Sequence, residues 1–534
     1  MSSTPTDGAR HGGTATDALV PPPGCPAHAG AAAAVDPDVV RLNSPDHQSD
    51  PMGVYEQLRA RYGPVAPVLV EGDLPAWLVL GYRENLEVVR TPNRFSRDSR
   101  NWGSFNRGEV DAESPLLPML GWQPLVVFLD GEEHQRLRKA VTDSLDQLDR
   151  RGVRRHVTRF ANQLIDTFCA EGEADLVGQF AEQLPMLVMT QLFGIPDEYG
   201  PRLTEAVLDL VRGTDTAFQS NEFVVETLQQ HIPRKRDQPG YDIGSWLMEH
   251  PAGLTDEEVV QHSRMMLAAA NQNTTVCISN TLRLVLSDPR FRASLAGARM
   301  TLPDAVEQVL WDEPSTMVCP ARWAVGDTQL GDAHIRAGDM LLLGLAAGNV
   351  DPEIRPDLTV PMHGNRSHLA FSGGPHECPG QDIGRAITET AVDVLLSRLP
   401  DIHVTVPEDE LVSVSTWLSR HLTALPVQFT PQPPTAKAGE AGYSGAGKPS
   451  ASATPAAVTP AVTTTAHAST AAPATVTEPT PAVTGGPGAT EPEGRASARP
   501  SVATPGQAAV PSPVLTSRRP SLWRRLIGRV RRRG

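Results

Sequence analysis

Long apolar runs are missing from this sequence, and cysteines are few. No stretch of 18 apolar residues occurs, so we expect no membrane-spanning helix. The N-terminus has no basic region followed by an apolar run, so we expect no signal peptide. The five cysteines are odd in number, and their spacing indicates neither disulfide pairs nor a zinc site. This usage fits a reducing compartment, and we expect a cytoplasmic protein.

Aromatic residues are nearly absent from the two ends of the chain. Residues 432–520 consist largely of Ala, Pro, Thr, Val, Ser and Gly, with Tyr443 as their one aromatic residue. Such a composition cannot bury enough apolar surface to offset the conformational entropy lost on folding. Residues 1–35 are similarly rich in Ala, Gly and Pro. We therefore predict a disordered segment at 1–35, a folded domain at 36–431 and a disordered linker at 432–520.

Basic residues are scarce outside the C-terminal end. The formal net charge is −15, and residues 432–534 hold 12 Lys and Arg against 4 Asp and Glu, a charge of +8. The remaining residues therefore carry −23. An acidic body argues against general binding of nucleic acid, and we expect no nucleic-acid partner.

The basic C-terminal end has a pattern of its own. From Arg518 onward there are eight Arg and no acidic residue, and apolar residues recur at helical spacing. Ser521 can cap the start of a helix. We predict a basic amphipathic helix at 521–534, suited to an anionic membrane surface such as the inner face of a cell membrane. An acidic protein partner for 518–534, or a charged end without a partner, are the alternatives.

Helical periodicity dominates the folded part. We expect helices at about 50–59, 83–90, 132–148, 153–170, 185–192, 201–212, 256–288, 302–312 and 380–399. Strands are expected at 65–70, at 77–80, in 317–345 and as a final pair around 421–427. The second strand should begin after Pro75, because proline does not favour an interior strand position. The fold class is mainly α with a minor β-sheet, and residues 97–125 form a long loop of the kind that carries function.

One stretch, 371–380, is rich in Gly and Pro and contains a single cysteine. It reads Phe-Ser-Gly-Gly-Pro-His-Glu-Cys-Pro-Gly, with Cys378 just before a helix that begins near Gly380. A helix N-terminus and the N–H groups of tight turns favour a thiolate, which can be an axial ligand of haem iron. A structural cysteine buried in a glycine turn is the alternative. The pattern resembles the haem-ligand loop of the cytochrome P450 family, in which Phe371 would pack near the sulfur and Gly380 beside the haem.

The resemblance implies the P450 fold, with haem b between the long helix and the helix after Cys378, and groups that hold the haem propionates. Residues 130–138 resemble the segment whose His and Arg bind propionates, and His134 and Arg138 lie four apart, on one helix face. Cationic donors there would offset two carboxylates that burial disfavours. Arg322 and His376 match two further propionate partners. A surface His/Arg pair is the alternative for His134 and Arg138.

The long helix at 256–288 carries the stretch that crosses the distal haem face in the family. There the family pattern is Ala-Gly-x-acid-Thr, and the acid and Thr deliver protons to oxygen. Thr274 is kept, Ala270 lines the haem cavity, and Asn271 and Asn273 stand at the Gly and acid positions. Because an amide does not titrate, Thr274 and Asn273 would have to act by holding water. Polar residues on a long helix without a special role are the alternative.

A further family motif, Glu-x-x-Arg, is missing. Gln308 and Trp311 occupy its positions, and the Arg of the later segment is replaced by His363 or Gly364, with Arg366 close but displaced. Losing all three charges together is physically coherent, because removing only one partner leaves an uncompensated buried charge. The chain resembles a small bacterial group of the family that lacks this motif, some of whose members are encoded beside small GTPases.

Proline at position 379, directly after the cysteine, is a third departure. This position often holds Leu in the family, whose N–H can point at the sulfur, whereas proline has no N–H. We therefore expect a less stabilised, more electron-donating thiolate and a lower reduction potential of the iron.

Two functions follow from the resemblance. The first is a monooxygenase that inserts one oxygen atom from O2 into an apolar small molecule, with ferredoxin and ferredoxin reductase as electron donors. The second is a haem-binding sensor or scaffold of low activity, recruited to the membrane by its basic tail. The Cys378 loop and Thr274 favour the monooxygenase, whereas the altered residues 271–273 and 308–311 and the tail favour the alternative.

Overall fold

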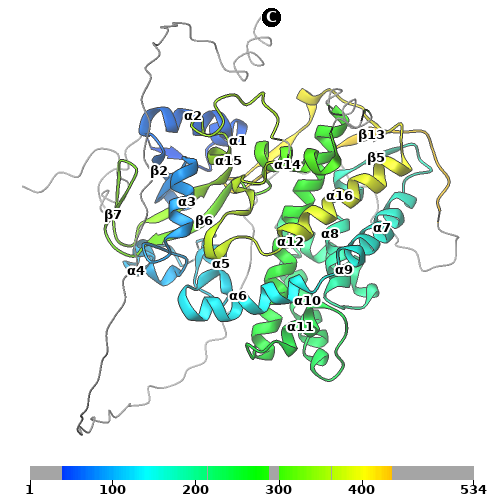
Figure 1. The fold of residues 1–534 in the computed structure, drawn as a ribbon, viewed down its shortest axis with the longest axis horizontal. Helices are drawn as coiled ribbons and strands as arrows, with labels where there is room; N and C mark the ends of the chain where they lie inside the picture. Colours follow the sequence, from blue (N-terminus) through cyan, green and yellow to red (C-terminus); the bar gives the residue numbers. More distant parts are fainter. Residues whose placement is uncertain are drawn as a thin grey trace, which may run out of the picture. The chain divides into compact units, whose positions relative to one another are not determined.

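The computed structural model describes residues 39–435 except 113, 213–214, 288–290, 292–296, 298–299 and 363. The predicted disordered segment 1–35, nearly all of the predicted linker 432–520 and the predicted helix 521–534 lie outside the described residues. Most helices lie on one side of Figure 1, and the largest sheet lies on the other with α2, α3 and α15 around it. The predicted fold class, mainly α with a minor sheet, is confirmed.

All nine predicted helices are present, within a few residues of their expected ends. The helices are α1 (Pro45–Ser49), α2 (Pro51–Tyr62), α3 (Tyr82–Arg90), α4 (Gly103–Asn106), α5 (Leu117–Leu120), α6 (Gly131–Asp146), α7 (Arg150–Asp166), α8 (Leu184–Leu192), α9 (Gly200–Arg212), α10 (Ala217–His231), α11 (Ile243–Glu249), α12 (Asp256–Ser287), α14 (Leu302–Asp312), α15 (Leu345–Asn349) and α16 (Gln381–Arg398). The other six of these helices, α1, α4, α5, α10, α11 and α15, were not expected. In α11 residues 243–248 are all buried, so no amphipathic period marks it.

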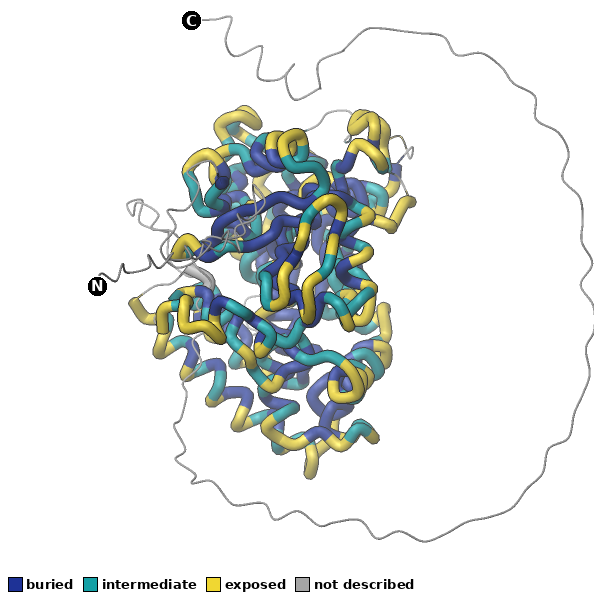
Figure 2. The backbone as a smooth tube through the Cα atoms, turned by 90° about the vertical axis from the view of Figure 1, so that its left-hand side faces the viewer, coloured by how far each residue is buried: buried dark blue, intermediate teal, exposed yellow. Residues whose placement is uncertain are grey.

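The largest sheet has six strands in the order β1-β2-β3-β9-β6-β4. Its strands are β1 (Val40–Arg41), β2 (Val65–Val70), β3 (Leu74–Val79), β4 (Phe95–Ser96), β6 (Val318–Ala324) and β9 (Met340–Gly344). Alternate residues of β2 and β3 enter two separate apolar clusters: Val68 and Leu78 pack with Leu342, whereas Trp77 and Val79 pack with Leu341 and Leu343. Both faces are therefore covered, and Figure 2 shows these strands as buried chain.

The prediction that β3 begins after Pro75 was wrong. Pro75 lies inside the strand, opposite Leu69 of β2. The parallel pairing of β3 with β9 covers only Trp77–Val79, so at Pro75 the strand has no partner on that side and a missing N–H interrupts no ladder there.

Three smaller sheets complete the described strands. They contain β5 (Glu173–Asp175), β7 (Thr328–Leu330), β8 (Ala333–Ile335), β10 (His403–Val404), β11 (Ser413–Ser415), β12 (Arg420–Leu422) and β13 (Pro426–Gln428). The expected final pair around 421–427 does not form, because β12 pairs with β11 while β13 pairs with β10 and β5. Short strands carry too little local pattern to specify their partners.

The long helix α12 is the axis of the helical half (Figure 1). Its 32 residues contain no Pro or Gly, and Asp256, Glu257 and Glu258 in its first turn interact favourably with the helix dipole. Helices α8, α14 and α16 pack against it, and its apolar side chains join those of α6, α7 and α16 in the largest core cluster. Among the helices in the described part of the chain, none is long and apolar enough to cross a membrane.

Candidate functional site

The Cys378 loop is a compact turn in front of α16. A one-turn helix at 369–371 and another at 374–376 precede the cysteine, whose backbone N–H donates to the Phe371 carbonyl at 2.9 Å. Gly374 has φ +65°, and a Cβ there would collide with the Val89 carbonyl, so only glycine fits. Burial raises the pKa of the Cys378 thiol, whereas the N–H of Gly380 and the charge of Arg138 favour the thiolate.

A cluster of buried histidine, arginine and aspartate side chains lies beside this loop. The His134 and His376 rings are 4.1 Å apart between centroids, and His376 Nε2 lies 3.2 Å from Asp130 Oδ1. Burial lowers the pKa of His376 to about 3, and burial together with the charge of Arg97 lowers that of Arg322 to about 9. Although burial favours the neutral acid, hydrogen bonds from His376 and Ser96 bring the pKa of Asp130 to about 2.

This cluster has more donors than acceptors. Among the described residues, His134 Nε2 is buried without a hydrogen-bond partner, and the buried Arg322 guanidinium donates to one carbonyl, that of Ala321. Buried cations need compensating anions. The donor set therefore fits the two propionates that a haem would place there.

Sequence reasoning missed Arg97. This side chain donates to the carbonyls of Val127, Pro320 and Ala321, and its backbone N–H donates to Asp130. It thereby joins the segment before α6 to β6, which carries Arg322. Nothing in the local sequence marks this role of Arg97, which directly follows the short strand β4.

Arg138 forms its side-chain hydrogen bond within its own helix, α6. Its Nε donates to Thr142 Oγ1 at 3.1 Å, and it lines a hollow of about 450 Å³ that also contains Cys378 and Glu377. Burial and the charge of Arg138 both lower the pKa of His134. Arg138 therefore acts electrostatically on both the histidine cluster and the thiol.

The middle of α12 faces open space. Ala268, Ala269 and Asn273 are exposed although both halves of the helix are largely buried, and Ala270 is half-buried. Asn273 Nδ2 donates to the Ala269 carbonyl at 2.9 Å, and its Oδ1 accepts from Thr316 Oγ1 at 2.9 Å. Both ends of this amide are engaged, which leaves it less free to hold water than expected.

Two other polar residues of α12, Thr274 and Asn271, are neighbours of Asn273 in the sequence. Thr274 is 6% exposed, and the Oδ1 atom of Asn271 is buried without a hydrogen-bond partner among the described residues. A buried acceptor of this kind binds an ordered water readily.

At the positions of the missing Glu-x-x-Arg motif, uncharged side chains form hydrogen bonds to the later segment, and a charged pair lies beside them. Gln308 Oε1 accepts from the Met362 N–H at 2.9 Å, and Trp311 Nε1 donates to the Asn365 carbonyl at 2.8 Å. The neighbouring Asp312 accepts from Arg355 Nη1 at 2.9 Å. Local sequence pattern carries no signal for this pair, because its members are 43 positions apart.

A second buried charge cluster is centred on Glu307, one turn before Trp311 on α14. Glu307 accepts from Arg385 Nε at 2.6 Å and from His368 Nε2 at 2.9 Å, and Arg366 Nε lies 3.2 Å away. Burial alone would raise the pKa of Glu307, but the hydrogen bonds and charges of His368 and Arg385 hold it below its ordinary value. The Arg385 guanidinium lies 4.6 Å from the centre of the Phe371 ring.

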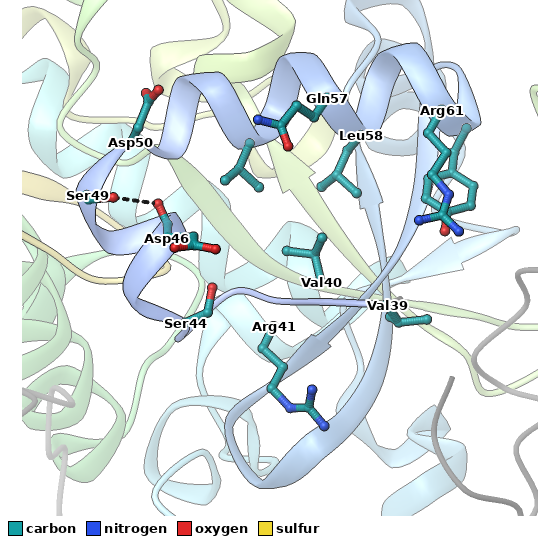
Figure 3. A pocket seen from close by; sticks show the side chains of 12 residues that line it. Val39, Val40, Arg41, Ser44, Asp46, Ser49, Asp50, Gln57, Leu58 and Arg61 are labelled. Carbon is teal, nitrogen blue, oxygen red and sulfur yellow. Dashed lines mark hydrogen bonds between the residues drawn. The ribbon is translucent and has the colours of Figure 1, made fainter. Parts of the chain in front are cut away.

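Another hollow, also of about 450 Å³, lies between β1, α1 and α2 (Figure 3). Twelve residues between Val39 and Tyr62 line it, and none of them is a predicted site residue.

The chain is similar in sequence and in structure to known bacterial proteins. No family model matches it. It is 32% identical over 397 residues to cytochrome P450 monooxygenase PikC of Streptomyces venezuelae, covering 72% of this chain and 92% of the relative. It is 30% identical to mycinamicin IV hydroxylase/epoxidase of Micromonospora griseorubida, covering 69% and 95%. The structure of CYP154A1 from Streptomyces coelicolor A3(2) superposes with a TM-score of 0.64 at 28% identity, over 73% of this chain and 100% of that one. The chain belongs to the cytochrome P450 family of haem-binding monooxygenases.

Proposed function

We propose that this P450 inserts one oxygen atom into an apolar small molecule, with electrons from a ferredoxin and its reductase. The observation that carries the proposal is the juxtaposition of Cys378 with a buried cluster of histidine and arginine side chains, in which His134 Nε2 lacks a hydrogen-bond partner among the described residues. Bound haem supplies the oxygen chemistry, while the protein positions it. Cys378 would be the axial ligand, with Phe371 and Gly380 beside it.

His134, His376 and Arg322 would hold the propionates, with Arg138 contributing from the side of Cys378. Their burial supports this role, because carboxylates would offset positive charge that the described residues leave uncompensated. Arg97 would act through Arg322 and Asp130 by fixing the segments that carry them.

Thr274 would organise water on the distal side, next to Ala270. Asn273 would contribute by fixing Thr316 at the cavity wall, since both ends of its amide are engaged. Neither amide nor hydroxyl titrates near neutral pH, so protons would pass through ordered water rather than through a carboxylic acid.

Relatives support an apolar substrate. One is named vitamin D(3) 25-hydroxylase of Pseudonocardia autotrophica, 28% identical to this chain. A solved relative, CYP154C4 from Streptomyces sp. ATCC 11861, is 26% identical, superposes with a TM-score of 0.65 and is described as testosterone-bound. The relatives are named as hydroxylases and monooxygenases. Their names therefore support the monooxygenase rather than the alternative, a haem sensor or scaffold.

The first test is the carbon monoxide difference spectrum of the reduced protein, with Cys378→Ser as control. A band at about 450 nm in the wild type, absent from Cys378→Ser, supports thiolate ligation. A band at about 420 nm in the wild type would contradict it. Substrate-dependent NADH consumption with a surrogate ferredoxin and reductase then tests the electron route.

We further propose that 518–534 binds an anionic membrane surface. Its support is the sequence pattern of eight Arg and interleaved apolar residues. Flotation with anionic vesicles should recover the full chain but not a chain lacking 518–534. Equal recovery of both would refute the proposal, and recovery only with an acidic protein would favour that partner.

A further inference from the structure

Residues 349–369, here called the strap, are fastened along α14. The strap leads from the end of α15 to the Cys378 loop. Within the residues that the structure describes, five hydrogen bonds join it to α14: Asn349 Nδ2 to the Leu310 carbonyl (3.0 Å), Arg355 Nη1 to Asp312 Oδ1 (2.9 Å), Met362 N–H to Gln308 Oε1 (2.9 Å), Trp311 Nε1 to the Asn365 carbonyl (2.8 Å) and His368 Nε2 to Glu307 Oε2 (2.9 Å). Five separate points therefore fix its course on the helix.

Arg355 is the unusual member of this set. The residue is 4% exposed, and its guanidinium centre lies 5.5 Å from the centre of the Trp311 ring. Its Nε and Nη2 atoms are buried without hydrogen-bond partners among the described residues, and its ion-pair partner there is Asp312. Asp312 in turn accepts from Gln308 Nε2 at 2.7 Å. A buried charge with one partner costs desolvation and is kept in place by that partner.

Two hydrogen bonds connect the end of the strap to the backbone of Cys378. Leu369 N–H donates to Asn349 Oδ1 at 2.7 Å, where the strap ends and the short helix 369–371 begins. The Phe371 carbonyl at the end of that helix accepts from the Cys378 N–H at 2.9 Å. A shift of the strap on α14 would therefore move the backbone that orients Cys378.

We propose that Arg355, paired with Asp312 and packed on Trp311, is the positioning residue that fixes the strap and thereby the orientation of Cys378. The uncharged side chains Gln308 and Trp311 supply hydrogen bonds to the strap, and the Arg355–Asp312 pair supplies the ionic contact between strap and helix at this point. This inference rests on the proposed role of Cys378 as haem ligand.

The test uses the purified holoprotein and four variants. Arg355→Gln and Asp312→Asn break the pair, Arg355→Lys keeps its charge, and Arg83→Gln is the matched control. Arg83 reaches Glu353 of the same strap at 3.6 Å, but their side chains are 73% and 66% exposed. The readouts are the ratio of the bands at about 450 and 420 nm in the carbon monoxide spectrum and the thermal unfolding midpoint.

Arg355→Gln and Asp312→Asn should each lower the band ratio by at least about fivefold, while Arg83→Gln leaves it unchanged and Arg355→Lys retains most of it. Unchanged ratios in both pair-breaking variants would overturn the inference, even with lowered midpoints, since the pair would then be structural only. If Arg355→Gln does not fold, the comparison of Asp312→Asn with Arg355→Lys decides: a loss in Arg355→Lys without one in Asp312→Asn refutes the pair. A wild type without the band at about 450 nm would instead defeat the proposed haem ligation.

Discussion

Replacing Glu307 by Gln is expected to destabilise the protein strongly, because it leaves a buried arginine without its carboxylate. The side chains of Glu307, Arg385 and His368 are 4%, 5% and 1% exposed. Arg385 retains one other side-chain hydrogen bond to a carbonyl-type oxygen, from its Nη1 to Gln381 Oε1 at 3.1 Å. That amide oxygen carries no net charge to balance the guanidinium.

The magnitude follows from this burial. Removing one partner of a buried ion pair costs about 3–5 kcal/mol, whereas exposed pairs contribute about 0–1 kcal/mol. Since Arg366 is 57% exposed, its contact with Glu307 adds little. The double variant Glu307→Gln/Arg385→Gln should cost less than the sum of the two single variants, because it leaves no uncompensated charge.

The same carboxylate should make stability depend on pH. Its folded pKa lies below its ordinary value because hydrogen bonds and charges from His368 and Arg385 outweigh the effect of burial. The folded state therefore binds fewer protons than the unfolded state near the unfolded pKa of about 4.5. The contribution of Glu307 is complete above that pH and is lost as the pH falls through the folded pKa, and Glu307→Gln should lack this acid-dependent part.

Urea unfolding followed by far-UV circular dichroism measures these free energies, with Arg83→Gln as the exposed-pair control. A cost for Glu307→Gln below about 1 kcal/mol, similar to the control, would refute the reasoning. So would equal acid sensitivity of the wild type and Glu307→Gln.

Three further predictions concern other groups. Burial lowers the pKa of His47 to about 4, and its Nε2 lies 3.2 Å from the Tyr55 hydroxyl. The unfolded chain takes up this proton first, so stability should fall as the pH drops from about 6.5 to about 4, by up to about 3 kcal/mol, and His47→Phe should flatten that part of a urea-unfolding series. Asn273→Asp supplies a titratable acid beside Thr274 and should raise NADH consumption with a surrogate ferredoxin pair by up to roughly a hundredfold; an unchanged rate would mean that the engaged side chain cannot relay protons. Pro379→Leu adds an N–H next to Cys378 and should raise the reduction potential in a redox titration, and no change would sink the expected effect of this proline.

Local pattern was enough for most helices and for the Cys378 loop. Helix α12 could be predicted almost to the residue, because a long segment without Pro or Gly carries its own signal. The loop could be predicted because Gly374 must take a positive φ against the Val89 carbonyl, a demand visible as glycine in the sequence. Strand partners could not: β12 and β13 are short, and their pairing with β11, β10 and β5 depends on where distant segments arrive.

For the candidate site, the sequence supplied the residue types and the fold supplied their partners. Cys378 and His376 in the patterned loop, and His134 one turn before Arg138, were identified through the resemblance to the P450 family, and their roles remain proposals. The loss of charge at Gln308 and Trp311 was also readable. What replaced it was not, because Arg355 and Asp312 meet only after the strap folds back along α14.

Sequence by itself thus determined the helical framework, the cysteine loop and the charged residues available to the site, since these depend on contacts within a few positions of each other. Tertiary structure alone decided that Arg97 joins β6 to the segment before α6, and that Arg355 rather than Arg366 meets Asp312. The physical reason is that a buried charge is compensated by whichever partner the packing brings near, and sequence spacing does not encode that distance.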